Sequence, residues 1–479
     1  MEEVKKEFNH TGGVNMTEGS IPKLLIKFAL PTILQNITLV VNSLVTAILA
    51  GRFIGAVALG AVAVTMPIIF IINSIAQGIT QANSILIAQA YGRRDYEEVK
   101  KIIDTSSVLM EIVCLTMMTL GIIFCNQLLH LIKTPDEIFP SAKIFFIIHL
   151  IGVPFIFVQF LFFQSLRGLG DSKRPMIFQF VSVGINLLTL PLLVTGIFGM
   201  PKLGIVGLGA ASVFGNVVLA FVIFIMLRKE KSILAPHIKN MQFVPKIAKM
   251  IFKIGFPSMI QQVLLNASIL FILSLVNSFG HFVTEGYGVG TRIDFLAFAM
   301  SISICMSVSI ISGQNLGVEA YDRVKKAFGW GVLFSVIISL IPASFAIFAP
   351  KLLMSMFINP NLPENMPVIE VGVSYLRIVG FNYILFNLLF AAEGIPLAAG
   401  QTWVATCVTL VATCLVRIPV AYWLSHTSLG YRGIWFAMIC SSMTAIIIIL
   451  SYFFSGKWMV KNLISQVKEE ETLDVPPHD

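Results

Sequence analysis

Four carboxylates lie within or beside long apolar stretches of the sequence: Glu111, Glu285, Asp294 and Glu393. Acidic side chains inside a membrane are costly, and they commonly mark ion pathways and proton relays. We therefore predict that ion coupling involves Glu285, Asp294 or Glu393. The alternative is a static ion pair with an arginine that also lies in an apolar stretch, namely Arg292, Arg377 or Arg417. Glu285 and Arg292 are seven residues apart and share a helical face, whereas Asp294 points elsewhere.

Uncharged polar residues in the same stretches repeat at helical spacing. The stripes are Gln35, Thr38, Asn42 and Thr46; Asn73, Gln77, Gln81 and Ser84; and Gln262 with Asn266. Steps of three and four residues place each set on one face of a helix. Because polar faces inside a membrane turn toward protein or water, the stripes predict a substrate cavity lined by Gln35, Asn42, Thr46, Asn73, Gln77, Gln81, Gln262, Asn266 and Asn382. The alternative is hydrogen bonding between helices.

The composition places these faces in a membrane. The 479 residues are 56% hydrophobic and 12% charged, with a mean hydropathy of +0.87, whereas soluble proteins carry about 25% charged residues. A membrane-spanning helix needs about 20 apolar residues. Twelve stretches meet that length: 24–50, 57–90, 104–128, 141–165, 175–197, 204–227, 248–278, 284–315, 327–350, 367–392, 403–425 and 433–455.

The chain also contains an internal repeat. The segment QAYGRRDYEEVKK (89–101) returns as QNLGVEAYDRVKK (314–326), and Pro31 and Gln35 return as Pro257 and Gln261. Each half has six stretches, an even number, so both halves enter the membrane from the same side as parallel repeats. We predict an all-α integral membrane protein with twelve transmembrane helices in two six-helix repeats. Its parts are a tail (1–22), an N-lobe (23–235), a C-lobe (236–460) and a second tail (461–479).

Charge and motifs narrow the function classes. Most of the 33 lysines and arginines fall in the tails and loops on the N-terminal side of the membrane, which places both termini in the cytoplasm of a cell-membrane protein. The net charge of +8 is therefore no sign of nucleic-acid binding. Residues 1–22 lack the pattern of a signal peptide. The six cysteines lack metal-ligand spacing, so no metal site is expected. No P-loop or hydrolase motif is present, so we expect neither an enzyme nor a cofactor, only a transported proton or sodium ion.

Several segments in a fixed order resemble a known family. They are ALPTILQN (29–36), AGRFIGAVALGAVAV (50–64), the repeated motif, LRGLGDSKRPM (166–176) and YGVGTRIDFL (287–296) running to SGQNLG (312–317). Residues 22–460 resemble the multidrug and toxic compound extrusion (MATE) transporters. The resemblance implies twelve helices in two lobes and export of organic, often cationic, compounds driven by a proton or sodium gradient. Many members carry an Asp where this chain has Thr46, and an Asp where Leu190 precedes Pro191.

These observations predict a secondary active exporter of organic compounds, cationic or amphipathic, that works by alternating access. Its expected partners are a small organic substrate and the lipid bilayer, with no nucleic acid, and it is expected to function as a monomer. One alternative is a flippase for a lipid-linked oligosaccharide, which should have a more cationic cavity. Another is a passive channel.

Overall fold

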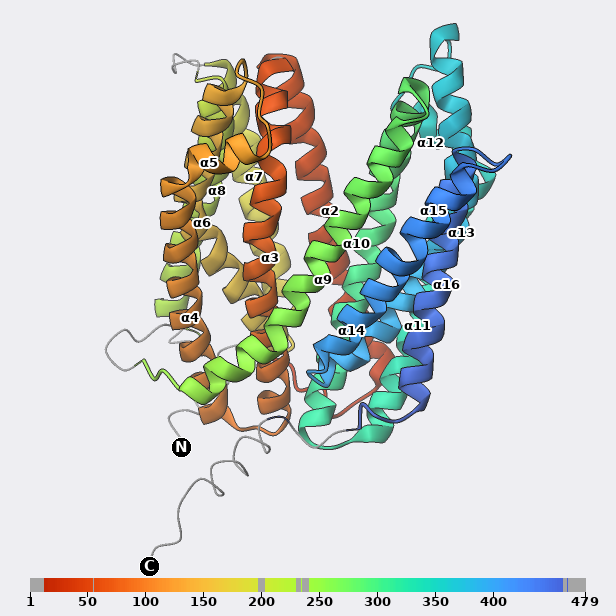
Figure 1. Ribbon diagram of the computed structural model, residues 1–479. Helices are drawn as coiled ribbons and strands as arrows, with labels where there is room; N and C mark the ends of the chain where they lie inside the picture. The colour runs from red at the N-terminus through yellow and green to blue at the C-terminus, as the bar shows by residue number, and fades with distance from the viewer. Residues whose placement is uncertain are drawn as a thin grey trace, which may run out of the picture. The chain divides into compact units, whose positions relative to one another are not determined.

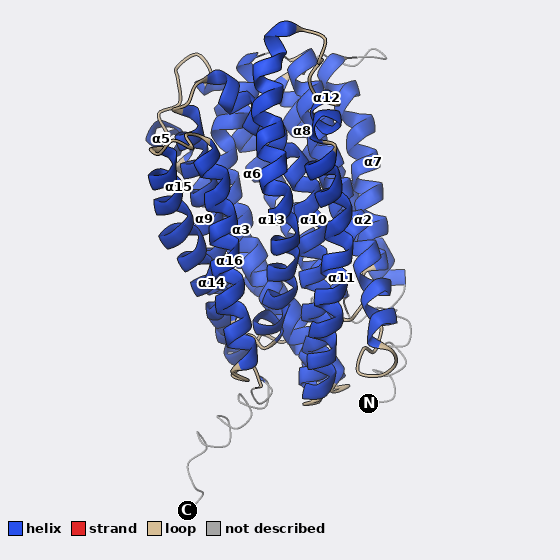
Figure 2. Ribbon diagram, turned by 90° about the vertical axis from the view of Figure 1, so that its right-hand side faces the viewer, coloured by secondary structure: helices blue, strands red, loops and turns tan. Residues whose placement is uncertain are grey.

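A computed structural model describes residues 13–54, 56–196, 203–229, 234, 241–459 and 463. Every regular element in these ranges is a helix (Figures 1 and 2). In chain order they are α2 (Ile21–Phe53), α3 (Ala56–Gly92), α4 (Tyr96–Ile123), α5 (Cys125–Leu131), α6 (Phe139–Gly168), α7 (Lys173–Thr195), α8 (Ile205–Lys229), α9 (Pro245–Asn277), α10 (His281–Gly317), α11 (Tyr321–Phe348), α12 (Pro350–Ser355), η2 (Pro363–Asn365), α13 (Met366–Ala398), α14 (Thr402–Thr409), η3 (Leu410–Arg417), α15 (Ile418–Ser425) and α16 (Arg432–Phe454).

Twelve of the described spans are long and apolar enough to cross a membrane, as the sequence predicts. Large apolar side chains remain exposed along these helices, for example Ile112 on α4, Leu188 on α7 and Ile447 on α16. Such surfaces suit lipid rather than water, because contiguous apolar patches are rare on soluble monomers. The eleventh span consists of α14, η3 and α15, and η3 is a π-helix that ends at Arg417. Runs of π-helix are uncommon and occur often at functional sites.

Contacts divide the chain into two compact units. Unit 1 contains residues 1–15 and 34–256, and unit 2 contains residues 16–33 and 257–479. The division passes through α2 just after Pro31 and through α9 just before Pro257. These are the two prolines that the repeat relates. The first part of α2 therefore packs with the second half of the chain, and the first part of α9 packs with the first half.

Hydrogen bonds fix the segment just before α2 within unit 2. The Met16 N–H donates to Gln314 Oε1 at 2.8 Å, and the Met16 carbonyl accepts from Asn315 and Arg323 at 3.1 and 3.2 Å. Arg323 also donates to the Gly19 carbonyl at 3.2 Å. Gln314, Asn315 and Arg323 lie in the second copy of the repeated motif, which therefore binds the chain ahead of the first membrane helix.

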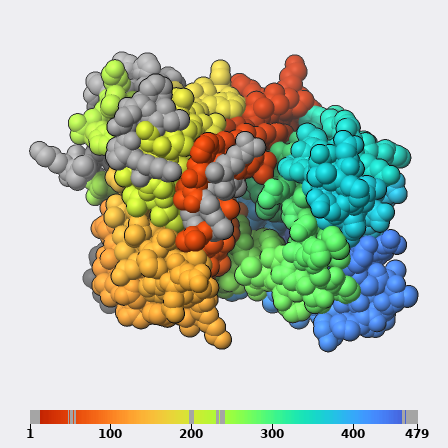
Figure 3. Space-filling model, turned by 90° about the horizontal axis from the view of Figure 1, so that it is seen from above, coloured from red at the N-terminus to blue at the C-terminus, as the bar shows by residue number. Residues whose placement is uncertain are grey.

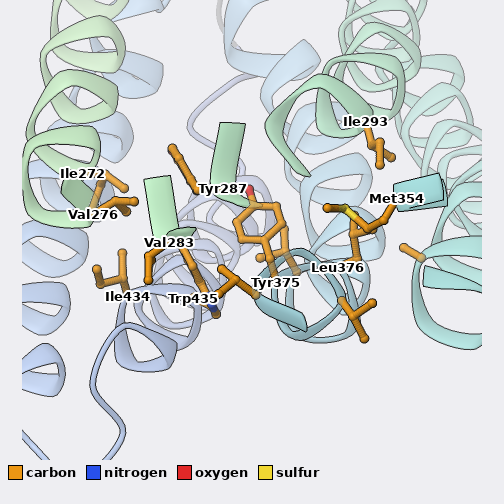
Figure 4. Packing of buried hydrophobic residues seen from close by; sticks show 14 of the residues in the cluster. Ile272, Val276, Val283, Tyr287, Ile293, Met354, Tyr375, Leu376, Ile434 and Trp435 are labelled. Atoms are coloured by element: carbon orange, nitrogen blue, oxygen red, sulfur yellow. The ribbon is translucent and has the colours of Figure 1, made fainter. Parts of the chain in front are cut away.

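The core of unit 2 is built on α10 and α13. Tyr287 of α10, Tyr375 of α13 and Trp435 of α16 lie side by side (Figure 4). The Tyr287 and Trp435 rings stack with centroids 5.4 Å apart, and Tyr375 meets Trp435 edge to face at 4.7 Å. Gly290 permits this approach, because a Cβ there would lie 2.4 Å from Tyr375 Cδ1.

In unit 2 the connections α9–α10, α11–α13 and α15–α16 emerge on one face, as Figure 3 shows for that unit.

Unit 1 is packed through α3, α6 and α8, where glycines allow close approach. A Cβ at Gly168 of α6 would lie 2.8 Å from the Ser84 carbonyl of α3. The C-terminal end of α6 is therefore held tightly against α3.

Candidate functional site

Asp294 of α10 sits in a cluster of hydroxyl groups within unit 2. The Tyr375 hydroxyl donates to Asp294 Oδ2, and the Tyr383 hydroxyl donates to Oδ1 at 2.5 Å. Both tyrosines belong to α13 and are almost fully buried. Their spacing of eight residues places them on one face of the helix. Hydrogen bonds to an ionised group are about twice as strong as neutral ones, so the two tyrosines hold the carboxylate firmly.

Glu393, near the end of α13, is also buried, with 8% of its surface exposed. Gln261 of α9 donates to Glu393 Oε1, and the same amide nitrogen lies 3.1 Å from Thr409 Oγ1. The hydrogen-bond partner of this carboxylate is thus a neutral amide.

None of the arginines proposed as static partners forms an ion pair with these acids, although Arg417 interacts electrostatically with Tyr287 and Tyr375 beside Asp294. Arg417 Nε donates to Ser441 Oγ at 3.0 Å, and Arg292 and Arg377 are exposed. Among the described residues, no ion pair includes Asp294 or Glu393.

The other two acids are exposed. Glu285 lies near the start of α10 and Glu111 lies on α4, and both side chains face outward from their units. Neither joins the hydroxyl cluster, so Glu285 remains a prediction from sequence. In the described ranges no group of three or more His, Cys, Asp or Glu residues could hold a metal ion.

Two of the predicted cavity residues in unit 1 have side-chain partners. Gln35 is buried and accepts a hydrogen bond from Arg167 Nη2 at 2.8 Å, and Asn42 accepts from Asn186 Nδ2 at 3.1 Å. Thr46 Oγ1 and Asn73 Oδ1 are buried atoms without a hydrogen-bond partner. Gln77 is exposed and Gln81 is half-buried on the same helix, α3.

The predicted cavity residues of unit 2 differ among themselves. Gln262 and Asn266 are half-buried on α9, and Asn266 Nδ2 donates to the Gln262 carbonyl at 2.9 Å. Asn382 of α13 is fully buried, and neither its Oδ1 nor its Nδ2 has a partner. Unpaired amide groups at such a depth are costly.

The sequence patterns do not single out Arg167, which lies beyond the predicted apolar stretch 141–165. The side chain is 7% exposed, at the last turn of α6. The turn that follows contains a buried acid, Asp171, which accepts from the backbone N–H groups of Lys173 and Arg174 at 2.9 and 3.2 Å. Burial raises the pKa of the Asp171 carboxyl, although these donors and the charge of Arg174 oppose the shift.

Each unit contains a glutamine that binds a buried charged side chain, and the sign of that charge differs between the units. Gln35 and Arg167 are 132 residues apart, and so are Gln261 and Glu393. The repeat that relates Gln35 to Gln261 therefore also relates Arg167 to Glu393. In each unit a glutamine of the helix that opens the repeat binds a charged side chain near the end of its fourth span. The Gln35 amide turns its oxygen to the cation, and the Gln261 amide turns its nitrogen to the anion.

Known proteins of this architecture resemble the chain along nearly its whole length. The family model MatE matches residues 31–192 and 257–423, once in each half. The probable multidrug resistance protein YoeA of Bacillus subtilis (strain 168) is 29% identical over 439 residues, which cover 91% of this chain and 94% of that protein. The probable multidrug resistance protein NorM of Thermotoga maritima is 21% identical over 454 residues, with 94% and 96% covered.

A solved structure of MATE in complex with MaD3S superposes with a TM-score of 0.86 at 20% sequence identity, covering 94% of this chain and 99% of that one. This likeness confirms the predicted fold class of twelve membrane helices.

Proposed function

The chain belongs to the MatE family, and from this premise we propose that it is a secondary active exporter that couples the outward movement of organic compounds to a proton or sodium gradient. Cationic or amphipathic compounds are the expected substrates. The protein acts as a monomer in the cell membrane with both termini in the cytoplasm. Its transport cycle alternates access between the two sides of the membrane.

One observation carries the coupling part of the proposal. Asp294 is an acid within a membrane span, and its two partners are tyrosine hydroxyls rather than an arginine. An arginine would hold the carboxylate permanently ionised. A hydroxyl donates to an ionised carboxylate and, after rotating, accepts from a protonated one. The site is therefore suited to two states, with and without a bound cation.

The magnitude of the driving force is sufficient. One charge that crosses 100 mV supplies about 2.3 kcal/mol. Since about 1.4 kcal/mol corresponds to a tenfold concentration ratio, one coupled ion sustains roughly a 50-fold gradient of a neutral substrate. Export of a cation against an inside-negative potential needs a second compensating charge.

The decisive test uses proteoliposomes loaded with the organic dye ethidium. A pH gradient and a sodium gradient are imposed separately, and dye flux is followed by fluorescence. With one of the two gradients, we expect the dye to be driven beyond its equilibrium distribution across the membrane. In Asp294→Asn we expect dye transport that no longer depends on that gradient. The control is Glu111→Gln, which removes an exposed acid. Equal gradient-driven flux in Asp294→Asn and the wild type would refute Asp294 as the coupling group.

The same assay separates the alternatives. A passive channel only equilibrates the dye, whatever gradient is imposed. A flippase for lipid-linked oligosaccharides moves labelled lipid between leaflets and leaves the dye in place. Accumulation of dye above equilibrium excludes both as the sole activity.

A further inference from the structure

Arg167 is a buried cation in unit 1 whose hydrogen bonds are incomplete. Nη2 donates to Gln35 Oε1 at 2.8 Å, and Nη1 donates to Gln164 Oε1 at 3.1 Å. The Nε atom is buried and has no partner. A guanidinium has five N–H donors, and these two bonds use two of them, so Nε and one hydrogen each of Nη1 and Nη2 are left over.

No carboxylate compensates this charge in the described part of unit 1. The acid nearest in sequence is Asp171, but its Oδ2 pairs with Arg174 Nε at 3.4 Å. Asp104, the other buried acid of the unit, pairs with Lys100 at 3.0 Å. Arg167 itself forms none of the ion pairs that the described residues make.

The helix end only partly offsets the cost. Arg167 lies in the last turn of α6, where the negative end of the helix dipole favours a cation. The two glutamine oxygens contribute neutral dipoles. Neither source supplies a negative charge, and a buried ion without a counter-ion carries a large desolvation penalty.

The repeat gives an independent reason to assign a ligand here. The equivalent position in unit 2 is Glu393, which is held by the equivalent glutamine. Two copies of one architecture thus present opposite charges at the same place. A purely structural cap for the end of the fourth span would have no reason to change sign. A binding site has a reason to differ in charge between the units, since the charge of a site selects its ligand.

We propose that Arg167, with Gln35 and Gln164, binds an anionic group of the transported compound, a carboxylate or a phosphate. The unpartnered Nε–H and a remaining Nη hydrogen can donate to the oxygens of such an anion. The inference rests on the proposed export function and narrows it. The preferred substrates carry an acidic group, as amphipathic zwitterions do, rather than positive charge alone.

A matched pair of dyes tests this inference. Rhodamine 110 has a free carboxylate, and rhodamine 123 is its methyl ester. Binding to purified protein in detergent is measured by fluorescence anisotropy. Because hydrogen bonds to charged groups are strong, we expect rhodamine 110 to bind about tenfold or more tightly than rhodamine 123. Arg167→Gln should remove this preference, and Arg377→Gln, which changes an exposed arginine, should keep it.

A second variant covers the possibility that Arg167→Gln folds poorly. Gln35→Glu places a carboxylate beside the guanidinium, so it should raise the melting temperature and abolish the dye preference. Equal affinity of the two dyes in the wild type would overturn the inference. So would a preference that survives both Arg167→Gln and Gln35→Glu.

Transport keeps the two proposals distinguishable. Gradient-driven export of rhodamine 123 without any preference for rhodamine 110 would leave the export function standing and reject the anion site. Selective binding of rhodamine 110 without gradient-driven export would support the anion site and reject the exporter.

Discussion

The aromatic packing beside Asp294 predicts a large difference between two neighbouring glycines of α10. In Gly290→Ala the new Cβ would lie 2.4 Å from Tyr375 Cδ1 and 2.8 Å from Cε1, whereas ordinary contact begins at 3.4 Å. In Gly288→Ala the new Cβ meets nothing within 4 Å. The two variants therefore make the same chemical change in one helix, with and without a clash.

The clash cannot be relieved by a small ring movement. Tyr375 is 1% exposed, packs against Trp435 at 4.7 Å and Tyr287 at 5.5 Å, and donates its hydroxyl to Asp294. Overpacking of this kind costs about 1–3 kcal/mol. Alanine gains up to about 1 kcal/mol of helix propensity over glycine, but both variants share that gain. Their difference is therefore the overpacking alone, about 1–3 kcal/mol.

Thermal unfolding in detergent, followed by tryptophan fluorescence at a fixed heating rate, measures this difference. For a unit of 150–250 residues, 1 kcal/mol shifts Tm by about 2–4 °C, so Gly290→Ala should melt at least about 2 °C below Gly288→Ala. Gradient-driven dye export should fall only in Gly290→Ala, because the displaced ring weakens the hold on Asp294. A Gly290→Ala protein that melts with Gly288→Ala and exports normally would refute the reasoning.

Three further outcomes are expected. Tyr383→Phe leaves Asp294 with a single hydroxyl donor, so stability should fall by about 1.5–3 kcal/mol, measured by thermal unfolding, and gradient-driven export should slow. Arg323→Gln removes a donor to the Met16 carbonyl, so the Met16 amide should exchange faster in hydrogen-exchange mass spectrometry. Asn42→Leu combined with Gln77→Leu should weaken dye transport about tenfold or more, as expected for two lost polar contacts.

The first two of these have matched controls. Tyr422→Phe removes a tyrosine hydroxyl that is exposed on α15, and Arg292→Gln removes an exposed arginine. Exchange at Met16 that is equally slow in Arg323→Gln and Arg292→Gln would contradict the anchoring role. Unchanged transport in the Asn42, Gln77 double variant would remove both residues from the cavity.

The fold was accessible from the sequence because it depends on periodic and repeated features. Twelve apolar stretches predicted the twelve membrane-spanning helices, and the offset between the two motif copies predicted a chain built of two halves. The grouping of the first part of α2 with unit 2, and of the first part of α9 with unit 1, was not accessible from the sequence. The segment before α2 binds Gln314, and no local pattern links residues so far apart.

The candidate site was only partly accessible. Asp294 was identified because an acid inside a span is unusual. Its partners were missed because Tyr375 and Tyr383 lie 81 and 89 residues away on another helix, and ordinary tyrosines in an apolar stretch carry no signal. Arg167 carries no such signal because it lies just beyond the apolar stretch 141–165. The match of Gln35 with Gln261, extended along the repeat, aligns Arg167 with Glu393.

The grouping of residues 16–33 with the second half of the chain also imposes an order on biosynthesis. The residues that bind Met16 are synthesised long after it, since 298 residues separate Met16 from Gln314. At ribosomal rates that interval lasts about 15–60 s. Unit 1 has all of its own chain once residue 256 is made, whereas residues 16–33 must wait for a partner that does not yet exist. The first membrane helix to be synthesised is therefore among the last to find its packing partners. In a chain interrupted before residue 314, Met16 lacks the hydrogen bonds that hold it.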